Sequence, residues 1–223
     1  MQQPVIYIIE SPTDSCWQIG KNLDQVQHLL LIGWQADVVK GGVPQTVSNI
    51  ISQTLCKIAT CSFPTSESIS NLKKYAPNAP FNYSPIISGF AGFLRKFYPS
   101  PPPILVSTSD AKLATQLFDA PLFSWELQST LVLLSDHKKA SPKLNLSTFK
   151  KLINNEKSLS EMQKIAHEKN IIAVLKPATD GEAAAVLFLS EDIKKTFLSV
   201  LKSIVIKYHF EVQFVSEDVF KNI

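Results

Sequence analysis

Two short polar segments of this chain place carboxylate and hydroxyl side chains directly after apolar runs. Glu10 and Asp14 follow one run, and Ser107, Thr108 and Asp110 end or follow another. Hydroxyls and the free backbone N–H groups of a helix N-terminus can bind a phosphate or a carboxylate. Paired carboxylates can also bind Mg²⁺ or share a proton. These five residues are therefore a candidate site for an anionic ligand, although Ser, Thr and Asp before a helix are also common capping residues.

From the other residues with reactive or metal-binding side chains, we predict no catalytic residue, no metal site and no cofactor. The four histidines are scattered and none has a metal-ligand spacing to a Cys, Asp or Glu. The three cysteines are an odd number at uninformative spacing, which is typical of buried thiols rather than of a disulfide framework. The chain also lacks a Gly-x-Ser-x-Gly elbow and a glycine-rich phosphate loop.

A lysine-rich segment is one candidate for binding a protein partner. Residues 137–169 carry eight lysines, including Lys150 and Lys151, against three glutamates. A surface this positive could face an acidic protein, an anionic lipid surface or a polynucleotide. It could equally be the solvated face of a helix.

A second candidate for partner binding is the proline-rich segment 63–103. Its aromatic residues include Phe90, Phe93 and Phe97. Aromatic side chains on a segment broken by prolines can form a protein-docking surface. They can also fold back onto a sheet as part of the core, and the sequence leaves both interpretations open.

The elements expected to position these residues alternate between strand and helix. Continuous apolar runs indicate strands buried on both faces, and apolar positions at three- and four-residue spacing indicate helices. The expected order is strand 5–9, helix 16–32, strand 36–39, a helix after Pro44, and a strand in 56–62. This βαβαβ order predicts parallel strands joined by right-handed crossovers, with any ligand beyond their carboxyl ends.

The rest of the chain continues this pattern as far as a polar segment at 135–142. Helices are expected at 66–75, 85–97 and 111–118, and strands at 104–107 and 131–134. The second part is expected to contain helices in 146–169, a hairpin of 171–175 with 184–189, a helix of 191–206 and a strand of 210–215. We therefore predict a doubly wound, mainly parallel α/β sheet in 1–135 and a smaller α+β part in 143–223, which may instead extend the first sheet.

Two segments of the first part, from Ile6 to Asp14 and from Pro103 to Asp110, each contain an apolar run followed by acidic or hydroxyl residues. The first resembles the first strand and acidic loop of the response-regulator receiver domain, a flavodoxin-like fold, and the second resembles that family's strand ending in a hydroxyl residue. The family has a phosphate-accepting aspartate at the end of its third strand, whereas 58–62 contain none. Lys176-Pro177 matches the family's lysine–proline pair but lies far later in the chain. The resemblance implies a degenerate receiver that serves as a binding module.

Composition limits where the protein works and what it binds. Of its 223 residues, 45% are hydrophobic and 18% are charged, as in ordinary globular proteins. No apolar run reaches the roughly 18 residues that span a bilayer, and the N-terminus lacks the features of a signal peptide. Only Arg95 among the 22 basic residues is an arginine, which argues against specific nucleic-acid recognition. We expect a soluble, cytoplasmic protein without a membrane span.

Two functional hypotheses follow from the sequence. The first is a non-catalytic protein-binding adaptor or structural subunit of a larger bacterial assembly, such as a signalling or secretion complex. The second is a small-molecule enzyme or sensor that binds a phosphorylated or carboxylated ligand at the carboxyl edge of the predicted sheet. The absence of a complete acid–base constellation favours the first.

Overall fold

Nine strands in the described part of the chain form a single sheet. A computed structural model describes residues 4–12, 28–34, 44–65, 70, 73–74, 77, 82–86, 104–119, 132–137, 164, 167–177 and 183–222. The strands are β1 (Val5–Glu10), β2 (Leu29–Trp34), β3 (Thr60–Thr65), β4 (Asn82–Pro85), β5 (Ile104–Thr108), β6 (Val132–Ser135), β7 (Ile171–Pro177), β8 (Ala183–Phe188) and β9 (Glu211–Phe214). The helices are α1 (Gln45–Ile58), α4 (Ala111–Asp119), α7 (Glu191–Val205) and α8 (Glu217–Phe220), with a 3-10 turn η5 (Ile206–Tyr208).

The sheet is mostly antiparallel, with the strand order β4-β5-β3-β6-β7-β8-β2-β1-β9. Seven of its eight neighbouring pairs are antiparallel. Only β1 and β9 pair in parallel. The prediction of a doubly wound, flavodoxin-like parallel sheet is therefore wrong.

The error has a physical cause in the central strands. Every residue of β2 and of β8 is buried. Burial on both faces makes a strand continuously apolar, whichever direction its neighbours run. An apolar run thus predicted two covered faces correctly but carried no information about strand direction.

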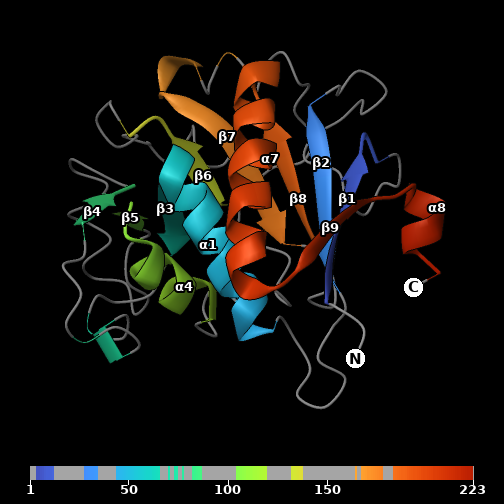
Figure 1. Cartoon of the computed structure of the whole chain (residues 1–223). Coiled ribbons are helices and arrows are strands. Elements are labelled where there is room, and N and C mark those ends of the chain that lie inside the picture. Colours follow the sequence, from blue (N-terminus) through green and yellow to red (C-terminus); the bar gives the residue numbers. More distant parts are fainter. Residues whose placement is uncertain are drawn as a thin grey trace.

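Helices α1, α4 and α7 cover one face of the sheet (Figure 1). Their apolar side chains pack with those of the strands into one core cluster. Two aromatic contacts join the layers: Phe63 meets Phe118 at 5.0 Å between ring centroids, and Phe188 meets Phe197 at 5.1 Å. A second cluster of buried apolar residues, which includes Tyr7 and Leu31, lies on the other face.

Local signals placed several elements correctly. The Asp110 carboxylate Oδ1 accepts hydrogen bonds from the N–H groups of Lys112 and Leu113 and so caps α4. The Ser190 hydroxyl accepts a hydrogen bond from the Ile193 N–H at the start of α7. The predicted hairpin is confirmed, because β7 and β8 pair antiparallel. The helix predicted after Pro44 is also confirmed as α1.

Other predicted elements were wrong. Residues 29–32 belong to strand β2 and not to a helix. Residues 56–58 are still helical, so β3 begins later than predicted. Pro85 ends an edge strand that sequence patterns missed, instead of starting a helix. The predicted strand 36–39 lies outside the described residues, as do most residues of the predicted helices 66–75, 85–97 and 146–169.

Strands from both sides of the predicted boundary at 135–142 belong to the same sheet. β6 precedes this segment and β7 follows it, and the two strands pair directly. Ser135 at the end of β6 is buried and its hydroxyl donates to the Thr60 carbonyl of β3. The sheet is therefore continuous from the first part of the chain into the second.

Candidate functional site

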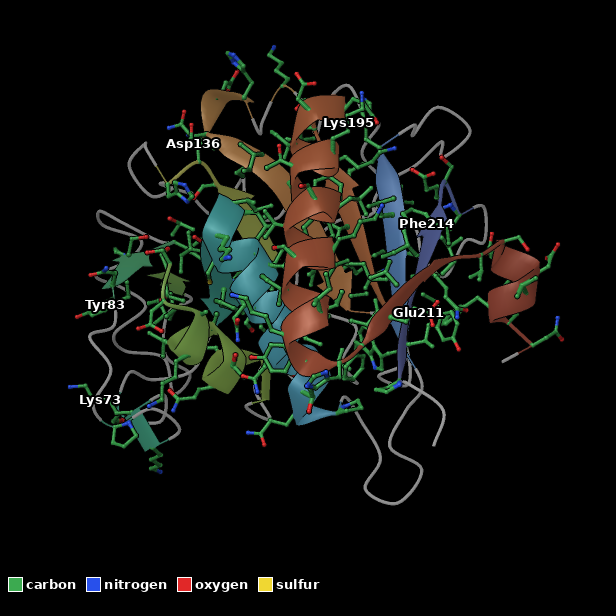
Figure 2. The ribbon with its side chains drawn as sticks, viewed as in Figure 1. Lys73, Tyr83, Asp136, Lys195, Glu211 and Phe214 are labelled. Atoms are coloured by element: carbon green, nitrogen blue, oxygen red, sulfur yellow. The ribbon has the colours of Figure 1, made fainter. Side chains whose placement is uncertain are left out.

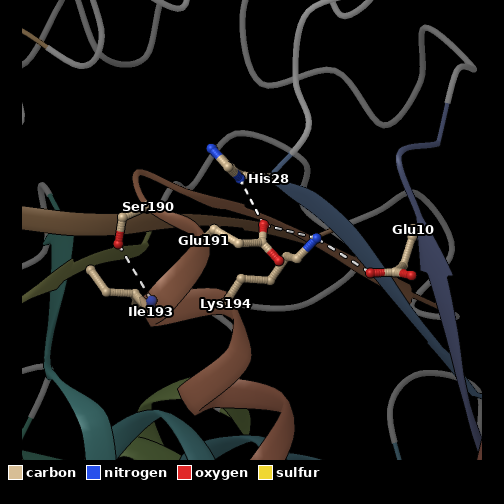
Figure 3. A network of polar contacts seen from close by, with 6 residues as sticks. All are labelled: Glu10, His28, Ser190, Glu191, Ile193 and Lys194. Carbon is tan, nitrogen blue, oxygen red and sulfur yellow. Dashed lines mark hydrogen bonds and ion pairs between the residues drawn. The ribbon is translucent and has the colours of Figure 1, made fainter.

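Ionisable side chains from three elements meet at one end of the strands β1, β2 and β8 (Figure 3). The antiparallel order places the end of β1, the start of β2 and the end of β8 side by side. Glu10 is the last residue of β1, His28 directly precedes β2, and Glu191 and Lys194 lie in the first turn of α7, just after β8. We call these four residues the charged cluster.

Lys194 is the centre of the charged cluster. Its Nζ atom lies 3.3 Å from Oε1 of Glu10 and 3.2 Å from Oε2 of Glu191. The Lys194 side chain is only 9% exposed, whereas those of Glu10 and Glu191 are 52% and 40% exposed. A buried ammonium is costly unless it is paired, and here two solvated carboxylates neutralise it.

The helix start explains how α7 presents this lysine. Ser190 caps the helix, and Glu191 and Asp192 lie in its first turn, where the helix dipole favours acidic side chains. Lys194 lies on the same buried face as Phe197 and Leu201, so its apolar stem packs in the core. From the core, its ammonium group reaches the end of β1, where Glu10 lies.

The charged cluster favours an ionised Glu191. Burial raises the pKa of this carboxyl group. Hydrogen bonds from Lys194 and His28, with the positive charges of Lys194 and Lys195, outweigh that effect and lower the pKa below its ordinary value. The His28 ring nitrogen Nδ1 lies 3.1 Å from Oε2 of Glu191. The cluster therefore anchors α7 to β1 through the Lys194–Glu10 ion pair and to the residue before β2 through the contact between His28 and Glu191. Within the described residues no group of His, Cys, Asp and Glu side chains could hold a metal ion.

The structure does not bring the predicted ligand residues together. Glu10 belongs to the charged cluster on β1, whereas Ser107 and Thr108 lie on β5, six positions away in the sheet. At a strand spacing of roughly 4.8 Å this separation is about 29 Å. Asp14 lies outside the described residues. The rim expected to unite these residues depended on neighbouring parallel strands, and β1 and β5 are not neighbours in the sheet.

The predicted ligand residues on and after β5 form hydrogen bonds within the protein instead. The buried hydroxyls of Ser107 and Ser62 lie 2.8 Å apart on paired strands. The Thr108 hydroxyl accepts a hydrogen bond from the Asp110 N–H at 3.0 Å. Asp110 itself caps α4, which is the alternative role that the sequence had left open.

The residues predicted to bind a protein partner cannot be placed. Lys150, Lys151, Phe90, Phe93 and Phe97 all lie outside the described residues. The structure shows a different candidate surface, along the last strand of the sheet.

β9 is an edge strand with one paired and one open side. The N–H groups of Glu211 in β9 and of Val215, the residue directly after β9, donate to carbonyl oxygens in or next to β1, at 2.9 and 3.1 Å. Alternate residues of a strand direct their backbone groups to opposite sides. Val212 and Phe214 therefore direct their N–H and C=O groups away from β1, where no strand of the described sheet follows.

Exposed apolar side chains lie on β9 and on the segments that directly precede and follow it in the chain. Ile206 is 71% exposed and Phe214 is 49% exposed, and Val219 on α8 is also exposed. Among the described residues the remaining large exposed apolar side chain is Tyr83, on the edge strand at the opposite end of the sheet (Figure 2). Three of these four side chains thus lie between residues 206 and 219.

One flank of α7 completes the surface. The Nζ atom of Lys202 lies 5.0 Å from the centroid of the Phe214 ring, a cation–π contact. Lys195 and Ile206 lie seven residues before and four residues after Lys202, on the same side of the continuous helix α7–η5, and all three are exposed. Lys195, Lys202, Ile206, Val212 and Phe214 are together called the β9 edge surface. The weak alternation of 210–215 predicted the strand, but nothing local predicted that it would be at an edge.

Comparison with protein-family models, with curated proteins and with solved structures found no match. No helix in the described part of the chain is long and apolar enough to cross a lipid bilayer. A functional proposal must therefore follow from the geometry of the charged cluster and of the β9 edge surface.

Proposed function

We propose that this chain is a non-catalytic protein-binding subunit that binds an extended segment of a partner protein along the open side of β9. The observation that carries the proposal is the coincidence of two features on one strand. Val212 and Phe214 direct backbone groups away from the sheet, and Phe214 is a half-exposed aromatic side chain. Addition of a partner strand would use both features, main-chain hydrogen bonds for affinity and side chains for specificity.

An open edge is a hazard that folded proteins usually guard. Common guards are a covering loop, a proline, a bulge or a charge that points inward along the edge. On β9 the two residues with outward backbone groups, Val212 and Phe214, are neither proline nor charged, and no register shift marks a bulge in their pairing with β1. An apolar, pairing-competent edge is better suited to a partner than to solvent.

The charges beside β9 indicate the chemistry of the partner. Phe214 pairs in register with Ile8, whose side chain is in the core on the helix face, so Phe214 also lies on that face. An added strand would place alternate side chains on the same face, next to Lys195 and Lys202. We therefore propose an extended segment with acidic residues at alternate positions, and an apolar residue against Ile206.

The test uses synthetic peptides of alternating acidic and valine residues, compared with peptides in which lysines replace the acids. Amide hydrogen exchange followed by NMR reads out strand addition directly. The acidic peptide should slow exchange at Val212 and Phe214, while Glu211 and Val215, already bonded at the β1 side, should change little. Failure of every peptide to protect Val212 and Phe214 would refute strand addition.

A matched pair of charge reversals tests the side-chain part of the proposal. Lys202→Glu should weaken binding of the acidic peptide by about fivefold or more, because it replaces an attraction of up to ~1 kcal/mol by a repulsion. Lys207→Glu changes the net charge equally, but residue 207 is about 140° around the helix from residue 202. Equal effects of the two variants would exclude the proposed orientation, and concentration-dependent dimerisation without peptide would identify a second copy of the chain as the occupant.

A further inference from the structure

Two of the three cysteines meet although their positions in the sequence did not predict a pair. Cys56 lies in the last turn of α1 and Cys61 is the second residue of β3. Their Sγ atoms are 3.8 Å apart. Cys56 is partly exposed and Cys61 is fully buried. The reversal of the chain between helix and strand therefore creates a dithiol in which Cys56 is the more exposed residue.

We propose that Cys56 and Cys61 form a reversible disulfide when the protein meets a peroxide. The Cys56 thiolate attacks one oxygen of hydrogen peroxide, the O–O bond breaks, and the products are a Cys56 sulfenic acid and, after protonation, water. The Cys61 sulfur then attacks the Cys56 sulfur, the S–O bond breaks, and the Cys61 proton leaves with the hydroxyl group as a second water. Two thiols and one peroxide thus yield one disulfide and two waters.

The environment of each sulfur fits its role. The hydrogen bond to Cys56 and complete burial raise the pKa of the Cys61 thiol well above its ordinary value. Cys61 therefore remains a protonated thiol beside Cys56 and is protected from direct oxidation. Cys56 is the more exposed of the two residues, so the oxidant reacts there first.

The geometry requires only a small approach of the two sulfur atoms. A disulfide bond is about 2.05 Å long, so the sulfurs must move together by roughly 1.8 Å. The bond would tie the end of α1 to β3, whose residue Cys61 lies between β5 and β6 in the sheet. α1 lies beside α4 and α7 on the helix face (Figure 1), so oxidation would fix the end of the helix against the sheet.

The test is peptide mapping of the full-length protein before and after titration with hydrogen peroxide. Trypsin cleaves after Lys57, between the two cysteines, so a disulfide would join peptides 41–57 and 58–73. The expected product is this linked pair, with a total mass lower by two hydrogens, and dithiothreitol should separate it. The Cys16→Ser variant should give the same linked pair at the same peroxide concentration.

Two single variants complete the test. Cys61→Ser should convert Cys56 to sulfenic and then sulfinic acid, because no thiol is available to resolve the first product. Cys56→Ser should leave Cys61 unmodified under the same conditions. Peptides carrying added oxygen without a link in the wild-type protein, or links of either cysteine to Cys16 or to a second molecule, would overturn the proposal.

Discussion

Replacement of Gly33 by alanine is expected to destabilise the protein by displacing one aromatic ring. Gly33 lies in β2, and a Cβ atom there would overlap the Cε2 and Cζ atoms of Phe220 and lie 3.0 Å from its Cδ2. Phe220 ends α8 and also contacts Tyr7, with 5.9 Å between the ring centroids. The ring is the far end of a side chain, so it would swing away, whereas the strand backbone would stay in place.

The magnitude follows from the packing that Phe220 would lose. Full burial of a phenylalanine side chain stabilises a protein by about 1.5–3 kcal/mol, and an aromatic pair contributes about 0.5–1.5 kcal/mol more. Because Phe220 is only partly buried, we expect Gly33→Ala to cost about 1–2 kcal/mol. In a Phe220→Ala background the obstructing ring is absent. The same substitution should then stabilise by about 0.4–1 kcal/mol, since alanine restricts the unfolded chain more than glycine does.

Urea denaturation of the wild type, the two single variants and the double variant measures this change of sign. The expected coupling between the two positions is about 1.5–3 kcal/mol, the difference between a cost and a gain. An equal cost of Gly33→Ala in both backgrounds would rule out displacement of Phe220, because the cost would then arise in β2 itself.

Other substitutions test the charged cluster and the buried hydroxyls. In urea denaturation, Lys194→Ala should lower the free energy of unfolding by about 1–2 kcal/mol. Lys194→Met should lower it by less than half of that, because methionine keeps the buried stem of the side chain and the carboxylates of Glu10 and Glu191 remain half-exposed. Glu191 has a lowered pKa in the folded state, so its contribution is complete above about pH 4.3 and is lost as pH falls through the lower folded-state value. Glu191→Gln should therefore flatten the acid side of a stability–pH curve, and an unchanged slope would contradict the pairing. Ser62→Ala should cost about 1–2 kcal/mol by leaving the Ser107 hydroxyl unpaired, and adding Ser107→Ala should recover part of that loss in the same assay. Ser52→Ala should raise the thermal midpoint, with a gain of about 1 kcal/mol, because the buried Ser52 hydroxyl has no hydrogen-bond partner among the described residues.

Features set by neighbouring residues could be predicted from the sequence, and features set by distant pairing could not. The caps at Asp110 and Ser190 act within three residues, so their helices were placed correctly. β2 shows the opposite case. The sequence predicts a helix for its run of apolar residues, because a short apolar run fits both the helix and the strand periodicity. Its neighbours β1 and β8 are far from each other in the chain, and no local pattern specifies that pairing.

The charged cluster had one signal that sequence reasoning could have used. Lys194 lies three residues before Phe197 and seven before Leu201, on the apolar stripe of a helix that was itself predicted. A lysine in that position needs carboxylate partners, because an unpaired buried ammonium is costly. The sequence predicts Glu10 as a candidate site residue, but as a ligand contact on a parallel sheet. Only the antiparallel order brings Glu10 to Lys194.

Helix α7 carries residues of both the charged cluster and the β9 edge surface. Lys194 anchors the start of the helix to β1, and Lys202 lies eight residues further along, about 12 Å at the rise of an α-helix. β1 is also the strand that holds β9, so the same strand positions the helix and the open edge. An anchored helix holds Lys202 over Phe214 before any partner arrives, and preorganisation of this kind lowers the entropic cost of binding. Loss of the Lys194 ion pairs should therefore weaken peptide binding at β9 even where the stem is kept by methionine and the fold remains intact.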